Sequence, residues 1–389
     1  MRLSFPKGFF WGAASASYQV EGNIENTDWA YEARTSKRVP VADSGPDHFN
    51  RFEEDFDIAK QLGHNAHRFS IEWARIEPAE GEFSAEGIRH YKRVIRALKS
   101  RGLTPFVTLW HFTLPKWLYV QGGAESPEFP VYFARYAAYV AEHLGEDVEH
   151  WVTMNEPVVF ASNGWYRGNW PPFKVYRFFK MFRVLRTLAE AHKLAYTRIK
   201  EKDLTAEVGV VKDNIYFHAN WNPFNKIAAK VMRQFWNFYF LDKVATHLDT
   251  IGLNYYFHKK FGDKQTYKKN DMGWDIFPEG LYQTLMELKR YGKPVFVAEA
   301  GIADHLDLYR GEYIHDLVYW THRAIDDGLP VKGFMYWSLT DNFEWALGYE
   351  KCFGLIGIDY KTKERHIRES AYVYKTICLD NAVMVDIEK

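Results

Sequence analysis

Short apolar runs rich in β-branched residues alternate with longer amphipathic segments along the whole chain. An apolar run of about four to eight residues between turn-forming residues is typical of a buried strand. Eight segments fit this pattern and are predicted to be strands: Phe9–Ala14, Ala66–Ile71, Thr104–Trp110, Trp151–Asn155, Glu207–Lys212, Thr250–Tyr255, Pro294–Glu299 and Gly333–Trp337.

The longer segments between these runs have the apolar spacing of helices that pack on a sheet. They are Phe49–Gly63, Ser84–Gly102, Val131–Gly145, Val175–Lys202, Phe224–His247, Glu279–Gly292 and Tyr309–Gly328. With no Pro/Gly/Ser-rich linker between them, this alternation predicts one α/β domain over residues 1–389, a single (β/α)8 TIM barrel. An open doubly wound sheet is the alternative, but it needs a Gly-rich phosphate turn where this chain has Ala14–Gln19.

Composition and charge limit the kinds of partner. Aromatic residues make up 17% of the chain, which suits both a thick core and a cleft that stacks against sugar rings. Lys plus Arg and Asp plus Glu are both 50, so neither a nucleic acid nor an anionic membrane is expected as a partner.

Cysteine usage and the N-terminal sequence bear on location and cofactors. With only Cys352 and Cys378, no disulfide framework and no zinc-like cluster is predicted. The N-terminus lacks a signal-peptide pattern, and no apolar stretch reaches the roughly 20 residues of a membrane helix. A cytoplasmic protein without metal or cofactor is expected, whereas its state as a monomer or a homo-oligomer stays open.

Two glutamates follow predicted strands and are the main candidates for chemistry. Glu156 follows the fourth strand and stands between Asn155 and Pro157, and Glu299 ends the seventh strand shortly before Gly301. In a closed barrel the carboxyl ends of these strands meet at one mouth. A facing pair of carboxyl groups there is the machinery of glycoside hydrolysis, with one acid/base and one nucleophile or base.

Further motifs at the strand ends resemble glycoside hydrolase family 1, the retaining β-glycosidases that include β-glucosidases and β-galactosidases. The resemblance covers nearly the whole chain. It rests on the opening Phe5–Gly12 with Ser17–Gly22, on Arg68–Ile76, His111–Leu118, Thr153–Pro157, Asn254–Tyr256, Val295–Gly301 and Trp337–Trp345. It implies a TIM barrel that hydrolyses a small β-glycoside or an oligosaccharide by double displacement.

The resemblance also implies a role for individual residues. Glu299 would be the nucleophile and Glu156 the acid/base. The residues implied to bind the sugar are Gln19, His111, Asn155, Trp337, Glu344 and Trp345, and those implied to support the two glutamates are Arg68, Asn254 and Tyr256. Taken alone, His111 or either tryptophan would more often be structural.

Three positions depart from the family pattern. Ala298 and Ala300 stand where a hydroxyl residue and an asparagine usually flank the nucleophile, and Cys352 stands where arginine is common. The two alanines leave Glu299 with fewer local hydrogen-bonding partners. The chain is also shorter than most relatives, which predicts trimmed loops at the mouth.

Other functions compete with this interpretation. A 6-phospho-β-glycosidase of the same family would need a phosphate pocket, and the negative charge of Glu344 opposes it. A non-catalytic sugar-binding barrel would lack one or both glutamates, and a metal-dependent hydrolase would need histidines at ligand spacing. The sequence does not decide among glucosides, galactosides and fucosides.

Overall fold

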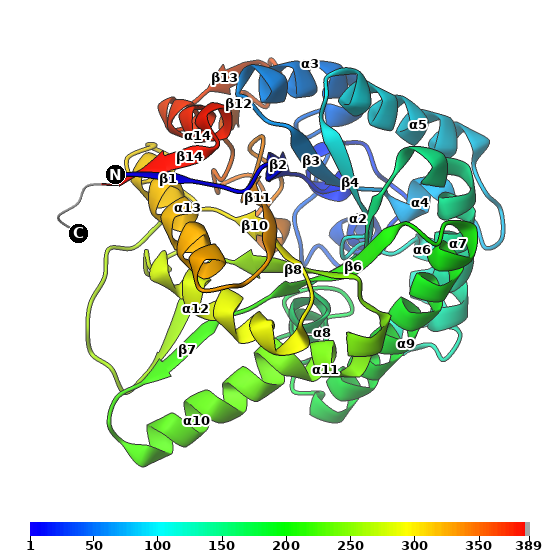
Figure 1. Cartoon of the computed structure of the whole chain (residues 1–389). Helices are drawn as coiled ribbons and strands as arrows, with labels where there is room; N and C mark the ends of the chain where they lie inside the picture. The colour runs from blue at the N-terminus through cyan, green and yellow to red at the C-terminus, as the bar shows by residue number, and fades with distance from the viewer. Residues whose placement is uncertain (386–389) are drawn as a thin grey trace.

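The computed structural model describes residues 1–385, and in this part of the chain eight parallel strands close into a barrel (Figure 1). The barrel strands are β2 (Phe10–Ala14), β3 (Ala66–Ser70), β4 (Thr104–Trp110), β5 (His150–Asn155), β6 (Glu207–Asp213), β8 (Thr250–Tyr255), β10 (Val295–Ala300) and β11 (Val331–Trp337). Each coincides with a predicted strand to within a few residues, so the predicted (β/α)8 barrel is confirmed. Because all neighbours pair in parallel, the carboxyl ends of the strands share one mouth.

Helices cover the outside of the barrel. The longer ones are α3 (His48–Gln61), α5 (Ala85–Ser100), α7 (Phe129–Leu144), α9 (Phe178–Lys202), α12 (Glu279–Leu288), α13 (Arg310–Asp326) and α14 (Glu369–Asp380). The predicted helix 224–247 is divided into α10 (Pro223–Arg233), a π-helical segment Gln234–Phe238 and α11 (Tyr239–Val244). The helix α14, which follows the last barrel strand, was not predicted.

The barrel interior is packed at its amino end. Phe106 from β4 lies against Phe10 and Phe296, with ring centroids 5.2 and 5.3 Å apart. These rings join small residues such as Ala14 and Ala66 in an apolar cluster inside the barrel, while a larger cluster lies between the strands and the helices. The rings of Phe10, Phe106 and Phe296 also line a cavity of about 400 Å³ that opens at this amino end.

Short strands outside the barrel pair in twos. They are β1 (Arg2–Ser4) with β14 (Ala382–Met384), β7 (Tyr216–Ala219) with β9 (His258–Phe261), and β12 (Ile356–Ile358) with β13 (Arg365–Ile367). The first pair brings the two ends of the described chain side by side (Figure 1). Residues 386–389 of the predicted domain lie outside the described residues. Among the described helices, none has the length and apolar character needed to cross a membrane.

Candidate active site

A cavity of about 720 Å³ opens at the mouth of the barrel. Residues predicted for the site line it at nine positions: Gln19, His111, Asn155, Glu156, Tyr256, Glu299, Trp337, Glu344 and Trp345. The other two predicted residues, Arg68 and Asn254, are fully buried behind the wall and bond to lining residues. The fold thus brings all of the predicted site residues together.

An irregularity in β10 turns Glu299 toward the cavity. Val295 and Val297 pack between the barrel and its helices, whereas Phe296 and Ala298 pack inside the barrel. Strict alternation would direct Glu299 outward with the two valines. The pairing of β10 with β8 shifts register between Val297 and Glu299, and such a shift re-aims the side chain that follows it.

Two donors hold the carboxyl group of Glu299. Arg68 Nη1 donates to Oε1 at 2.5 Å, and the Tyr256 hydroxyl donates to Oε2 at 2.6 Å. Burial, followed by the charges of Glu299 and Glu156, raises the pKa of Tyr256 well above its ordinary value, so its hydroxyl stays a donor. Both oxygens of Glu299 accept hydrogen bonds, one of them from a cation, and donors of this kind stabilise a carboxylate. Arg68 and Tyr256 thus give Glu299 hydrogen bonds that the side chains of Ala298 and Ala300 cannot donate.

Glu156 sits at a strained turn between β5 and α8 (Pro157–Trp165). Its φ of 44° is unusual for a residue other than glycine. The turn is fixed by Pro157 in the first turn of α8 and by the Glu156 N–H, which donates to the Val211 carbonyl at 2.9 Å. Asn254 Nδ2 donates to Glu156 Oε1 at 2.6 Å. Strain of this kind persists where surrounding contacts over-determine the geometry, as at functional sites.

The environment of Glu156 favours its protonated form. Burial, and then the negative charges of Asp213 and Glu299, raise the pKa of Glu156 well above its ordinary value. These surroundings favour the carboxylic acid form of Glu156, whereas Glu299 beside it accepts from Arg68 and Tyr256. Two carboxyl groups whose environments separate their protonation states are the requirement for combined acid and nucleophile chemistry.

A hydrogen-bond network links the supports of the two glutamates. Asn155 Oδ1 accepts from Arg68 Nη2 at 2.8 Å and from Asn254 Nδ2 at 3.4 Å. The amide nitrogen of Asn155 donates to His111 Nε2 at 3.2 Å. Burial and then the charge of Arg68 lower the pKa of His111, so its ring is neutral and can accept this bond. The network fixes the orientation of Asn155 beside both carboxyl groups.

Among the described residues, two side-chain oxygen atoms of residues that line the cavity have no protein partner. Gln19 Nε2 donates to Asn342 and to the Phe343 carbonyl, but in the described chain its Oε1 is buried and unpaired, as is Glu344 Oε2. Burial, and then the charge of Glu299, raise the pKa of Glu344 to about 8. Buried polar atoms are normally satisfied, so unpaired ones at a cavity wall fit a ligand rich in hydroxyl groups.

Aromatic faces complete the wall. Trp337 and Trp345 are 3% and 6% exposed. The Trp345 ring lies 4.9 Å from Trp29 and is stacked on Tyr18 at 6.1 Å, so its position is fixed. His111 lies nearly parallel to both tryptophans, at 6.0 and 6.1 Å. Rigid aromatic faces beside polar atoms without a protein partner suit a sugar ring, which has both C–H faces and hydroxyl groups.

Two charged residues of the site, Lys212 and Asp213, were missed in the sequence. Asp213 lines the cavity, accepts from Trp236 Nε1 at 3.3 Å and, within residues 1–385, has an unpaired Oδ1. Burial raises the pKa of Asp213 to about 6 and lowers that of Lys212 to about 8. Two consecutive charged residues at the end of an apolar strand were the available signal.

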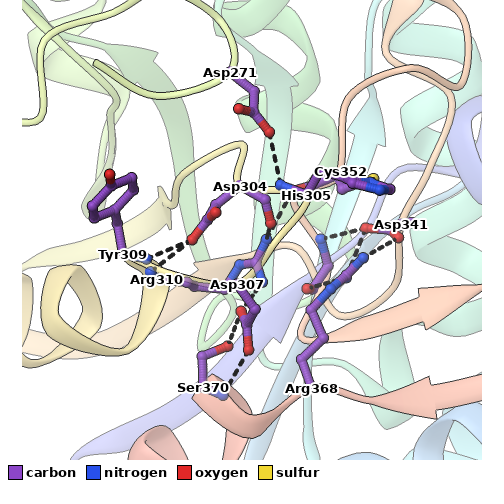
Figure 2. Close-up of polar contacts among 11 residues, drawn as sticks. Asp271, Asp304, His305, Asp307, Tyr309, Arg310, Asp341, Cys352, Arg368 and Ser370 are labelled. Atoms are coloured by element: carbon purple, nitrogen blue, oxygen red, sulfur yellow. Dashed lines mark hydrogen bonds and ion pairs between the residues drawn. The ribbon is translucent and has the colours of Figure 1, made fainter. Parts of the chain in front are cut away.

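A cluster of polar side chains supports the loops after β10 and β11 (Figure 2). Arg368 donates to both oxygens of Asp341 at 2.7 and 3.0 Å, which anchors the loop that carries Glu344 and Trp345. Arg310 Nη2 donates to the Cys352 carbonyl at 2.9 Å. Arg310 and Arg368 thus stabilise the region around Cys352, the position where arginine is common in the family. Among the described residues no group of three or more His, Cys, Asp or Glu is placed to hold a metal ion.

The sequence profile described as "Glycosyl hydrolase family 1" matches residues 1–247 and 247–383. The chain belongs to this family. It is 34% identical over 440 positions to "Beta-glucosidase A" of Thermotoga maritima, which covers 97% of this chain and 98% of that protein. As a member of family 1, the chain is a glycoside hydrolase of the retaining β-glycosidase type.

Solved family 1 structures are similar over nearly the whole chain. The "beta-glycosidase from Pyrococcus horikoshii" has a TM-score of 0.94 and 35% identity, covering 99% of this chain and 97% of that one. The "Beta-glucosidase from Thermotoga maritima in complex with glucoimidazole" has a TM-score of 0.92 and 32% identity, covering 97% and 99%. The 440-position alignment exceeds the 389 residues of this chain, so the family 1 relative carries segments that this chain lacks.

Proposed function

We propose that Glu299 is the nucleophile and Glu156 the acid/base in the hydrolysis of unphosphorylated β-glycosides. The observation that carries this assignment is the contrast between the two carboxyl groups. Glu299 accepts from Arg68 and Tyr256, whereas burial and the charge of Asp213 keep Glu156 protonated. We also propose that the whole chain acts as one cytoplasmic catalytic domain.

In the first step, a Glu299 oxygen attacks the anomeric carbon from the α face. The bond from that carbon to the leaving-group oxygen breaks, and Glu156 gives its proton to this oxygen. The product is a glycosyl ester of Glu299, which no longer carries a negative charge. The pKa of Glu156 then falls, because one of the neighbouring charges that raised it has gone.

In the second step, Glu156 is the base. Water enters from the β face and gives a proton to Glu156 as its oxygen bonds to the anomeric carbon. The ester bond breaks, Glu299 is restored as a carboxylate beside Arg68, and the sugar leaves with its β configuration retained.

The proposed sugar contacts follow from the lining groups. Gln19 and Glu344 would bind the outer hydroxyl groups through their unpaired oxygens. Asn155, with His111 behind it, would reach the 2-hydroxyl, while Trp337 and Trp345 contact the ring. A structure of the related β-glucosidase from T. maritima is a complex with glucoimidazole, which supports a small sugar-like ligand for this cavity. As a carboxylate, Glu344 would repel the phosphate of a 6-phospho-glycoside, but with a pKa of about 8 it is mainly a carboxylate only above that pH.

Azide separates the two roles chemically. With a β-glycoside of an activated phenol, Glu156→Ala should regain turnover in azide and give a β-glycosyl azide, because the ester still forms on Glu299. Glu299→Ala should give the α-azide, because azide then attacks directly. Glu201→Ala, at an exposed glutamate of α9, is the control that should need no azide. The same azide anomer from both active-site variants would contradict the assignment.

A further inference from the structure

An exposed apolar face lies outside the barrel, along α10 and the start of α9. We call it the α9–α10 face, formed by residues 175–186 and 221–235. Four of its aromatic side chains are largely exposed: Tyr176 (77%), Phe179 (88%), Trp221 (90%) and Phe224 (79%). Large exposed aromatic patches on soluble proteins mark interaction sites, and α10 lies at the outer edge of the molecule (Figure 1).

The helix α10 does not bury its apolar stripe. Phe224, Ile227 and Val231 have the i, i+3, i+7 spacing of one helix face, yet all three are exposed. Within α10 only Ala229 is buried. A surface helix of a globular protein would normally turn its apolar stripe toward the core. Here the stripe faces solvent.

Phe182 joins the two helices into one continuous face. Its ring lies 4.8 Å from Phe178 and 5.3 Å from Phe235, which follows α10. The face also borders the mouth of the barrel. Arg167 lines the cavity and forms a bridge with Val175, at the edge of the face.

Charge is strongly segregated on this part of the chain. Residues 157–189 and 214–241 contain no Asp or Glu, although the whole chain has equal numbers of both signs. The basic residues in these two segments are Arg167, Lys174, Arg177, Lys180, Arg183, Arg186, Lys226, Lys230 and Arg233. Lys174 and Lys180 pair with Glu125, and Arg233 lies 3.6 Å from Glu287. In residues 1–385 the lysines of α10, Lys226 and Lys230, form no ion pair.

We propose that the α9–α10 face docks the protein on an anionic lipid surface. The exposed aromatic and aliphatic side chains would enter the headgroup region, and the basic row of α10 would bind lipid phosphate and carboxylate groups. A second copy of the chain fits less well, because a two-fold contact would bring basic residues against basic residues. This inference departs from the expectation of no membrane partner, which rested on net charge alone.

Vesicle binding tests the proposal on the full-length protein. At low salt, the protein should co-sediment with phosphatidylcholine vesicles that contain about one-third phosphatidylserine, and binding should weaken as salt rises. Phosphatidylcholine alone should bind much less. Since each basic residue near an anionic surface contributes about 1 kcal/mol, or roughly fivefold in affinity, Lys226→Glu/Lys230→Glu should weaken binding by about 25-fold or more.

Two further variants complete the experiment. Phe224→Ser/Ile227→Ser/Val231→Ser should lose binding, whereas Lys332→Glu/Lys361→Glu, with the same charge change at exposed sites elsewhere, should keep it. All variants should hydrolyse a soluble nitrophenyl β-glycoside normally, which shows that they fold. Absence of binding to anionic vesicles, or equal loss in both charge variants, would overturn the proposal. The proposal would also be overturned if the protein did not bind vesicles and analytical ultracentrifugation showed an oligomer that the serine variant no longer forms.

Discussion

Single residues in the cavity differ in chemistry because of their neighbours. Glu156 and Glu299 are the same residue type at equivalent strand ends. Glu299 accepts from the buried cation of Arg68, whereas the negative charge of Asp213 helps to raise the pKa of Glu156. Asp213 therefore sets the environment of Glu156, as Arg68 sets that of Glu299.

A pH profile tests this role of Asp213. With a pKa of about 6, Asp213 is negative at neutral pH and helps to raise the pKa of Glu156. Asp213→Asn removes that charge, so Glu156 should ionise earlier. The alkaline limb of kcat/KM, which reports loss of the acid, should move to lower pH by about one unit.

The control for this prediction is Asp203→Asn, at a partly exposed carboxylate that does not line the cavity. Its pH profile should match that of the unchanged protein. An alkaline limb in Asp213→Asn that stays in place would mean that the Asp213 charge does not reach Glu156.

Sequence reasoning located the candidate residues but not the balance of charges among them. Glu156 and Glu299 were recognisable because each follows an apolar strand, and family motifs supplied the others. The effect of Asp213 on Glu156 could not be predicted. It depends on the burial of side chains from β5, β6 and β10, which are far apart in the chain and become neighbours only in the closed barrel.

Secondary-structure elements were predictable to different degrees. The barrel strands were identified because both of their faces are buried, which makes each a nearly continuous apolar run. The strands β7, β9, β12 and β13 have three or four residues each, too few to show a period. The break in the predicted helix 224–247 was also missed, because the π-helical turn depends on packing and not on apolar spacing.

The contact between β10 and β11 at the mouth leaves no room for a side chain at Gly301. A Cβ atom there would come within 1.9 Å of the Trp337 carbonyl oxygen. Gly301→Ala should therefore push the two strand ends apart, destabilise the protein by about 2 kcal/mol and displace Trp337. We expect kcat/KM to fall by about tenfold or more, since small misplacements at an active site are costly.

Gly145→Ala provides the matched control. Gly145 has a helical φ of −61°, and an added Cβ would have no neighbour within 4 Å. Thermal unfolding and kcat/KM of this variant should stay close to those of the unchanged protein. Equal behaviour of the two alanine variants would show that the close approach at Gly301 is unimportant.

On the scale of the whole molecule, net charge conceals a marked separation of signs. Basic residues without acidic neighbours in the sequence gather on the α9–α10 face, while the cavity holds Glu156, Glu299, Glu344 and Asp213. Composition alone could not predict this separation, because it arises when distant segments fold against one another. The two regions lie next to each other at the mouth, so a bound surface and a bound sugar would be close.

Some carboxyl groups of the cavity also keep their protons near neutral pH. Burial and the charge of Glu299 raise the pKa of Glu344 to about 8, so near pH 7 Glu344 keeps a proton that it would lose in water, and the raised pKa of Glu156 acts in the same direction. A cationic sugar mimic favours the ionised carboxylates and should expel such protons as it binds. Its affinity should then rise with pH while the ligand remains charged.

Calorimetry in phosphate and in Tris, whose ionisation heats differ, should give unequal binding heats for the cation and equal heats for a neutral sugar. The site would thus exchange protons with the buffer whenever a positive charge enters or leaves it.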